Sequence, residues 1–165
     1  MRATLLLAAC VLPFAACSGV KTFELGLHGD TTLNPNEDNQ PNAVRVRVLR
    51  LVGEESARAF REAPFDALWS DPITAGNVVI DSSPLTLYVP PRKERVTVAV
   101  KDVPAKVTHF GVLGLFNSPV TGKDRVVIER GNFDALEVWL HDSVIDTRAP
   151  SAAATAPAAT GKPGS

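Results

Sequence analysis

The sequence predicts an all-β protein, a two-sheet antiparallel β-sandwich with one short added helix. Eight short segments with strand patterns recur at intervals of roughly 8–12 residues, a spacing typical of such sandwiches. In most of them apolar and polar residues alternate, so one face of the strand meets a core and the other meets solvent. Only the segment from residue 56 to residue 69 has the composition of a helix.

The first two predicted strands are separated by a long polar loop. Residues Thr22–His28 alternate cleanly and predict the first strand. Residues Asp30–Asn42 are rich in Asn, Asp and Pro, which favour turns and loops. Residues Ala43–Leu51 predict the second strand. Its alternation slips by one residue at Val48-Leu49, and this slip indicates a bulge or a bend.

The single helical candidate lies within Ser56–Trp69. Pro64 suits the first turn of a helix because its fixed φ is already helical and its missing N–H is not needed there. Asp71-Pro72 would end the helix, because a residue before proline avoids helical geometry. We therefore expect the helix to cover Pro64–Trp69, with a looser turn before it.

The remaining strands are expected at short intervals. Val107–Phe116 is apolar on both faces, which predicts a central strand, and Gly111 and Gly114 indicate where a neighbour packs closely. A turn is expected at Asn117–Lys123. The other predicted strands are Asn77–Ile80, Leu85–Val89, Arg95–Lys101, Arg125–Glu129 and Ala135–His141.

The N-terminal residues have the pattern of a lipoprotein signal. Arg2 precedes an apolar run from Ala3 to Ala16, which is too short to span a membrane as a helix. Phe14-Ala15-Ala16-Cys17 has the form of a lipobox, in which the cysteine thiol accepts the lipid and small residues give the peptidase access. Ordinary cleavage, with Cys17 as an incidental thiol, is the alternative. A covalent lipid on Cys17 is the only attached group that the sequence indicates, and no cofactor is expected.

The residues after Cys17 bear on the destination of the protein. Two or more acyl chains give stable anchoring, and no aspartate follows Cys17 to retain it at the inner membrane. By the rule of enteric bacteria, we expect the lipoprotein at the periplasmic face of the outer membrane. The predicted division is a signal peptide at 1–16, an acylated tether at 17–21, a β-sandwich at 22–147 and a disordered Ala/Pro-rich tail at 148–165.

Composition narrows the class of partner. The formal net charge is −1, and no basic patch interleaved with aromatic residues indicates nucleic acid as a partner. The chain has two cysteines, Cys10 and Cys17, and both fall in the signal region. The predicted domain therefore holds together by core packing without a disulfide.

No catalytic or metal-binding constellation is readable in the sequence. The three histidines, His28, His109 and His141, have no metal-ligand spacing, and no serine-nucleophile motif occurs. His109 lies in the most apolar strand, where we expect a packed or hydrogen-bonded side chain. His141-Asp142-Ser143 contains the residue types of a catalytic triad, but neighbours along a strand point to opposite faces. We therefore predict that the protein is not an enzyme.

The loop from Asn34 to Gln40 is the candidate binding segment. It carries oxygen donors that suit calcium, although it lacks the glycine and terminal glutamate of an EF-hand loop. A solvated loop and a protein-binding loop are the other interpretations. The candidate residues are Asn34, Pro35, Asn36, Glu37, Asp38, Asn39 and Gln40.

Together these elements resemble the TssJ (SciN) family, outer-membrane lipoproteins of the type VI secretion system. The resemblance rests on the lipobox, on Leu33-Asn34-Pro35 in the first loop, and on the apolar strand THFGVLGLF at 108–116. It also includes the helical segment with Phe60, Ala63, Phe65 and Leu68. It covers about residues 17–146.

The resemblance implies a transthyretin-like sandwich anchored in the inner leaflet of the outer membrane. It also implies that the loop between the first two strands binds the periplasmic domain of the inner-membrane protein TssM, which forms a complex with TssL. The alternative is an outer-membrane lipoprotein that binds glycan or calcium through its β-sandwich, for which Tyr88 and Trp139 are the outward-facing aromatic candidates.

Overall fold

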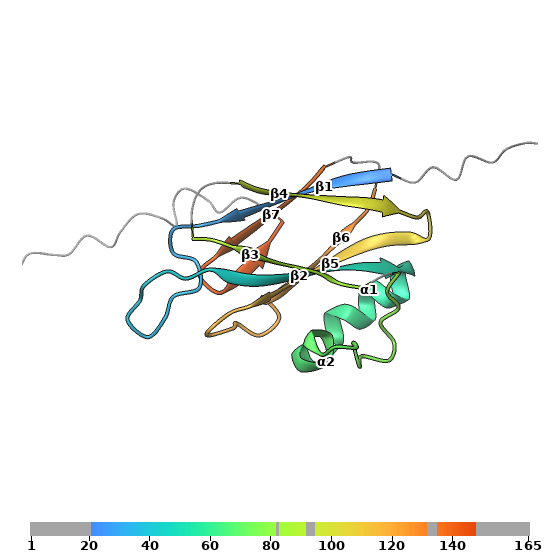
Figure 1. Ribbon diagram of the computed structural model, residues 1–165. Helices are drawn as coiled ribbons and strands as arrows, with labels where there is room; N and C mark the ends of the chain where they lie inside the picture. The colour runs from blue at the N-terminus through green and yellow to red at the C-terminus, as the bar shows by residue number, and fades with distance from the viewer. Residues whose placement is uncertain (1–20, 82, 92–94, 132–134, 148–165) are drawn as a thin grey trace, which may run out of the picture.

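Two four-stranded sheets face each other, and a helical layer covers the outer face of one of them (Figure 1). This computed structural model describes residues 21–81, 83–91, 95–131 and 135–147. Cys17 and the predicted tail at 148–165 lie outside the described residues. No helix among the described residues is long and apolar enough to cross a membrane.

The upper sheet in Figure 1 has the order β4-β1-β7-β8 and the lower sheet the order β3-β2-β5-β6. The upper strands are β4 (Arg95–Val103), β1 (Lys21–Gly29), β7 (Ala135–His141) and β8 (Val144–Asp146). The lower strands are β3 (Leu85–Val89), β2 (Val44–Val52), β5 (Val107–Leu115) and β6 (Arg125–Glu129). The predicted two-sheet β-sandwich is confirmed.

One strand pairing departs from the antiparallel prediction. β1 pairs with β7 in parallel, from Glu24–Ala135 to Gly29–Leu140, while the other pairings of named strands are antiparallel. A hairpin forces two strands to run in opposite directions, but β1 and β7 are joined by most of the chain. Their relative direction is therefore free of that constraint.

The space between the sheets is filled by the apolar side of the alternating strands. The apolar residues of the β1 alternation, Phe23, Leu25 and Leu27, are almost completely buried, as are alternate valines of β2. Phe23 and Phe110 pack across the space with ring centroids 5.6 Å apart. The buried residues of this core are Phe23, Leu25, Leu27, Leu33, Val44, Val46, Val48, Val89, Val100, Val103, Val107, Phe110, Val112, Phe116, Leu136, Val138, Leu140 and Ile145.

The sequence predicted a bulge or a bend at the alternation slip of β2, Val48-Leu49, but there is no bulge at this position. β2 pairs residue by residue with β5 from Arg45 through Leu51, and its irregularity comes only after Leu51. Val48 faces the other sheet, whereas Leu49 and Leu51 belong to a second core beneath the helices. Both faces of this half of the strand are covered, and therefore its neighbouring residues are both apolar.

The helical region is longer than predicted and is divided in two. α1 (Gly53–Glu62) precedes Pro64, and α2 (Phe65–Trp69) follows it. The prediction of a single helix at Pro64–Trp69 therefore recovers α2 and misses α1. α1 lacks a side-chain N-cap, which removes the usual signal of a helix start. It is held by burial of Ser56, Ala57 and Phe60 on one face.

Two short elements also differ from the prediction. Asn77–Ile80 is not a strand, because only Ile80 forms an isolated bridge, to Leu51. Val79 in this segment is exposed, so its apolar residues do not mark a sheet face. β8 was not predicted from the sequence, and it pairs with β7 after a tight turn in which Asp142 has a φ of 48°.

The central strand β5 is confirmed, with β2 on one side and β6 on the other. Its two glycines mark close packing, as expected from the sequence. A Cβ atom at Gly111 would lie 2.9 Å from the ring of Phe60, and one at Gly114 would lie 2.8 Å from the ring of Phe116. β5 can therefore support a helix on one face and the inter-sheet core on the other.

Candidate functional site

The predicted binding loop runs from the end of β1 to the start of β2 and has a fixed neck. Asp30 N–H donates to Leu140 O over 2.9 Å, and Asn42 N–H donates to Leu33 O over 2.9 Å. The Leu33 side chain is fully buried in the inter-sheet core. Both ends of the loop are therefore tied to the sandwich.

Asn34 is the main hydrogen-bonding residue of this neck, with only 3% of its surface exposed. Its Oδ1 accepts from Asn117 N–H over 2.6 Å, and its Nδ2 donates to Ala43 O over 3.1 Å. Its own N–H donates to Asp142 O over 2.5 Å. Its φ of 49° lies in the left-handed region, which asparagine tolerates better than most residues. Of the predicted partner-binding residues, Asn34 is thus largely buried, and its side chain forms hydrogen bonds within the fold.

The tip of the loop is a compact turn organised by Asn36. Its Oδ1 accepts from the N–H groups of Asp38, over 3.0 Å, and Gln40, over 2.8 Å. Asn36 N–H donates to Gln40 O over 3.0 Å, closing the turn. Asn39 has a φ of 57°, which the turn requires. The shape of the tip is therefore set before any partner arrives.

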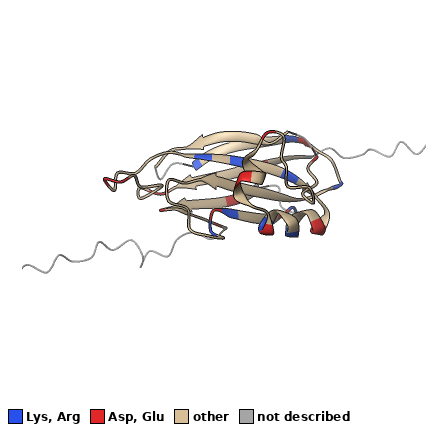
Figure 2. Cartoon of the chain, turned by 90° about the horizontal axis from the view of Figure 1, so that it is seen from below, with Lys and Arg blue, Asp and Glu red and all other residues tan. Residues whose placement is uncertain are grey.

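The side chains available at the tip are exposed and partly acidic. Glu37, Asp38, Asn39 and Gln40 are all exposed, and Pro35 is half-buried at their base. Acidic residues are visible at the far end of the loop, which among the described residues projects furthest to the left in Figure 2. The loop thus offers a partner carboxylates and amides on a preorganised backbone.

Two further turns support the loop at the same end of the sandwich. Asn117, directly after β5, donates through Nδ2 to Asn34 O over 3.3 Å, and Asp142 lies in the turn between β7 and β8. Sequence reasoning did not assign either residue to the site, although the turn residues around them were a usable signal. An open cleft at this end is lined by Asn34, Pro35, Asn36, Glu37, Asp38, Asn42, Ala43, Asn117 and Ser118.

The histidines are held in separate local contacts. His109 is 7% exposed, with Nδ1 2.8 Å from Thr108 Oγ1 and Nε2 3.0 Å from Glu54 Oε2, which confirms a hydrogen-bonded side chain. His141 ends β7, and its Nδ1 is 3.8 Å from Asp142 Oδ2, too long for a hydrogen bond. Among the described residues, no group of three His, Cys, Asp or Glu side chains could hold a metal ion.

The outer face of the upper sheet carries a second polar cluster. Arg95 bridges Glu24 and Glu137, with its Nη2 2.6 Å from Glu24 Oε1 and 2.7 Å from Glu137 Oε1. Glu137 also lies 2.7 Å from His28 Nε2, and His28 stacks on Trp139 with centroids 4.9 Å apart. The hydrogen bond from Arg95 lowers the pKa of Glu137, with a smaller contribution from His28, while burial opposes the shift. Arg95, Glu24, Glu137 and His28 therefore all have ion-pair or hydrogen-bond partners within this cluster.

Fold and site together define a β-sandwich protein that presents one hydrogen-bonded loop at one end. A family model described as type VI secretion lipoprotein (T6SS-SciN; VasD, EvfM, TssJ) matches residues 21–143. The chain therefore belongs to the type VI secretion lipoprotein family. This result confirms the resemblance derived from the sequence. The comparison with curated proteins found no match to this chain.

Solved structures share this fold at low sequence identity. The T6SS lipoprotein TssJ1 from Pseudomonas aeruginosa is 17% identical, with a TM-score of 0.64 over 78% of this chain and 95% of its own. Lip from Serratia marcescens, a membrane-bound component of that system, is 15% identical, with a TM-score of 0.64 over 76% of this chain and 95% of its own. A chain in a structure titled "T6SS protein TssM C-terminal domain (869-1107) from EAEC" is 20% identical, with a TM-score of 0.62 over 76% of this chain and 96% of its own.

Proposed function

We propose that this lipoprotein tethers the trans-envelope complex of the type VI secretion system to the outer membrane, without catalytic turnover. In this proposal a lipid on Cys17 holds the protein at the periplasmic face of the outer membrane. The tip of the β1–β2 loop binds the periplasmic domain of TssM, which is in complex with TssL. The function of the protein is then to join two membranes through one small domain.

The observation that carries the proposal is the division of the loop into a buried neck and an exposed tip. Asn34 and Leu33 fix the neck, so Glu37–Gln40 projects from the sandwich in one shape. A preorganised loop loses little conformational entropy when it binds. Membership of the type VI secretion lipoprotein family supports the choice of partner, as do related folds in structures titled for TssM and for the "Type VI membrane complex".

The loop contact is tested by changing only the tip. The double variant Glu37→Ala/Asp38→Ala removes two exposed carboxylates and leaves every hydrogen bond of the neck in place. We expect co-purification with the periplasmic domain of TssM to fall strongly. The matched control is Glu62→Ala/Asp66→Ala, which removes two exposed carboxylates from α1 and α2. Equal capture by both variants would reject this loop as the contact.

The anchor is tested separately. Cys17→Ser removes the thiol that would accept the lipid, and we expect the variant to leave the outer-membrane fraction for the soluble periplasmic fraction. Its isolated domain should still bind TssM, because the loop lies in the folded domain. A Cys17→Ser protein that stays with the outer membrane would contradict the anchoring half of the proposal.

A further inference from the structure

The outer face of the lower sheet carries a cluster of hydrogen-bond donors that lack acceptors. Among the described residues, three buried side-chain nitrogens have no hydrogen-bond partner: Arg45 Nε, Arg47 Nε and Trp69 Nε1. All three belong to one cluster, because both guanidinium groups lie over the Trp69 ring, 4.9 Å and 4.8 Å from its centroid. Buried donors are normally paired, and these three nitrogens have no acceptor among the described residues.

The two arginines differ in how they are held. Arg47 Nη1 donates to Leu68 O and Ser70 O, each over 3.0 Å, and so it fixes the end of α2 and the position of Trp69. Arg45 has no hydrogen bond or ion pair with a described residue and contacts the Trp69 ring. Burial, and to a smaller extent Arg45, lower the pKa of Arg47, while Asp71 opposes this shift. Arg45 is therefore the cation of the cluster that can take an external partner.

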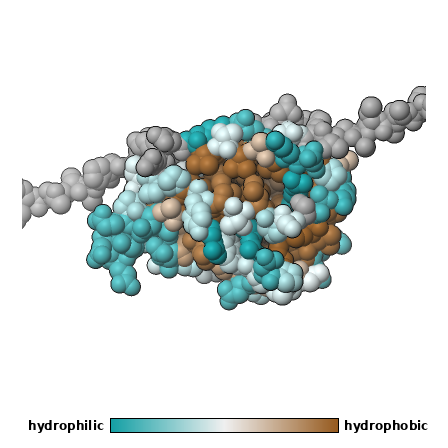
Figure 3. Space-filling model, in the orientation of Figure 1, coloured by the Kyte–Doolittle hydropathy of each residue, from teal (hydrophilic) through white to brown (hydrophobic). Residues whose placement is uncertain are grey.

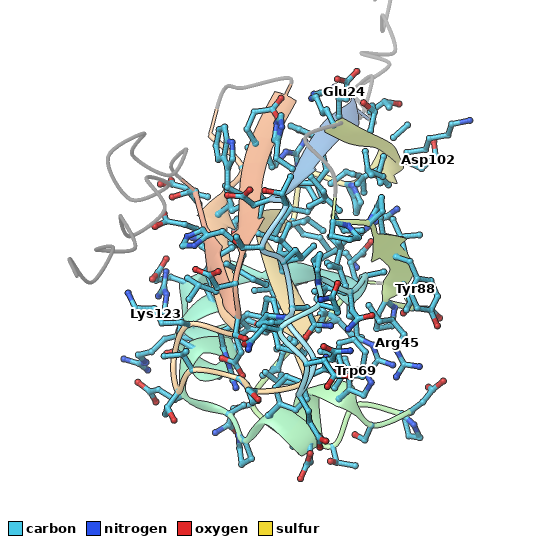
Figure 4. All side chains as sticks on the ribbon, turned by 90° about the vertical axis from the view of Figure 1, so that its left-hand side faces the viewer. Glu24, Arg45, Trp69, Tyr88, Asp102 and Lys123 are labelled. Atoms are coloured by element: carbon cyan, nitrogen blue, oxygen red, sulfur yellow. The ribbon has the colours of Figure 1, made fainter. Side chains whose placement is uncertain are left out.

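The cluster lies beside a free strand edge. β3 is at the end of its sheet, and within the described strands it pairs only with β2. Tyr88 of β3 is directly opposite Arg45, and Tyr88 is 65% exposed. Figure 4 shows Tyr88, Arg45 and Trp69 grouped on one side of the molecule, with the labelled acidic residues Glu24 and Asp102 at the other end.

The inner side of the same edge is apolar. Figure 1 is viewed toward the edge strands β3 and β4, and Figure 3 shows hydrophobic residues gathered on this face. Leu87 of β3 and Val96 and Val98 of β4 are only partly buried against the inter-sheet core, and Leu85 is 40% exposed. The edge therefore has an apolar side toward the sandwich interior and a cationic, aromatic side outward.

We propose that β3 is a docking edge for an extended segment of a protein partner in which apolar and acidic side chains alternate. A strand added to β3 would place its apolar residues over Leu87 and the interior. Alternate residues would point outward, because side chains of a strand alternate between faces. The added strand would lie about two strand spacings, or about 10 Å, from β2. An extended arginine side chain from β2 and an extended glutamate side chain from the added strand together cover that distance.

Charge complementarity selects an acidic segment over a neutral or basic one. No described carboxylate forms an ion pair with Arg45 or Arg47, whereas Arg50, Arg61, Arg95, Lys106 and Arg125 each have one. A carboxylate would give the Arg45 guanidinium the counter-ion that it lacks among the described residues. This surface is separate from the β1–β2 loop tip, and the inference does not rest on the proposed function.

The test uses the full-length chain in detergent and a seven-residue peptide of alternating valine and glutamate. Binding is followed by NMR through the indole N–H signals of Trp69 and Trp139 and the backbone amides of β3. We expect shifts at Trp69 and at Leu85–Val89 and none at Trp139, which lies on the other sheet. Arg45→Gln should weaken the peptide about tenfold, which is the effect of losing a charge-assisted contact. Arg58→Gln, the same charge change on exposed α1 surface, should not.

Each contrary result overturns the inference. A peptide of alternating valine and glutamine that binds equally well would remove the role of the arginines. If Arg58→Gln weakened peptide binding as much as Arg45→Gln does, the effect would come from the net charge of the protein and not from this cluster. If phosphatidylglycerol vesicles shifted the indole N–H signal of Trp69 and the peptide did not, the cluster would be a lipid contact. If Arg45→Gln fails to fold, Tyr88→Ser is the replacement variant, because it changes an exposed residue of the same surface. Peptide binding that Tyr88→Ser does not weaken would also overturn the docking edge.

Discussion

The ring of Phe60 packs directly on the backbone of Gly111, so closely that a Cβ atom there would lie 2.9 Å from two ring carbons. This contact joins α1 to the middle of the central strand. Phe60 is completely buried, and it is among the largest side chains of the core beneath the helices. The helical layer therefore depends on the absence of a side chain at one position of β5.

Gly111→Ala should destabilise the domain by about 1–3 kcal/mol, the cost typical of overpacking a filled core. The Phe60 ring cannot move aside easily, because it is enclosed. Urea denaturation followed by circular dichroism measures the loss. Gly76→Ala is the matched control, since a Cβ atom there would meet nothing within 4 Å. Similar stabilities for the two variants would contradict the packing argument.

Arg125 should be essential to the C-terminal end of α1. Its Nη1 donates to Phe60 O and Ala63 O, which are carbonyls left free at the helix end, while Asp124 pairs with its Nε over 3.0 Å. Arg125→Leu leaves the buried Asp124 carboxylate without its cation, and we expect a loss of about 3–5 kcal/mol. Thermal unfolding of the variant measures this loss of stability. Arg58→Leu, on exposed helix surface, should change stability little, and comparable losses would argue against this role.

Asn34 and Asp38 should separate stability from binding within one loop. Asn34→Ala removes two side-chain hydrogen bonds of the neck and leaves buried groups unpaired, so we expect a loss of about 1–3 kcal/mol. Asp38→Ala changes an exposed side chain and should stay within about 0.5 kcal/mol of the parent. Chemical denaturation of the two variants measures both changes in the free energy of unfolding. Equal losses would mean that the tip also supports the fold.

Acid should weaken the upper sheet through Glu137. Its pKa is lowered in the folded protein, chiefly by the hydrogen bond from Arg95, so its contribution to stability is present above its ordinary value of 4.5. That contribution is lost as the pH falls through the lowered value. Glu137→Gln should therefore flatten the decline of unfolding free energy below pH 4.5, whereas Glu62→Gln should not. A decline equally steep in both variants would exclude Glu137 as its source.

The strands were readable from the sequence because their periodicity reflects one-sided burial. Leu85–Val89, Arg125–Glu129 and Ala135–His141 have the bounds that were predicted. α1 was missed because it has no capping side chain and is stabilised by tertiary packing on Gly111. Local sequence does not report such packing, because the partner strand lies about 50 residues further along the chain.

The candidate loop was located from its composition, but its internal division was not. Asn34, Asn36 and Asn39 look alike in the sequence, yet the first is buried in the neck, the second closes the turn, and the third is exposed. The difference arises from contacts with Asn117, which is distant along the chain. The proposed docking edge at β3 could not be predicted from the sequence either, because the pattern of Ala43–Leu51 does not indicate that Arg45 lies over Trp69.

β1 begins beside the proposed tether and ends at the loop, and in its sheet it lies between β4 and β7. A pull exerted between the membrane and a partner held by the loop would travel lengthwise through this one strand. Ladder hydrogen bonds run across strands, so such tension shears the bonds on both sides of β1 together and does not peel them one after another. The placement of β1 gives the domain a mechanically resistant path between its two proposed attachments.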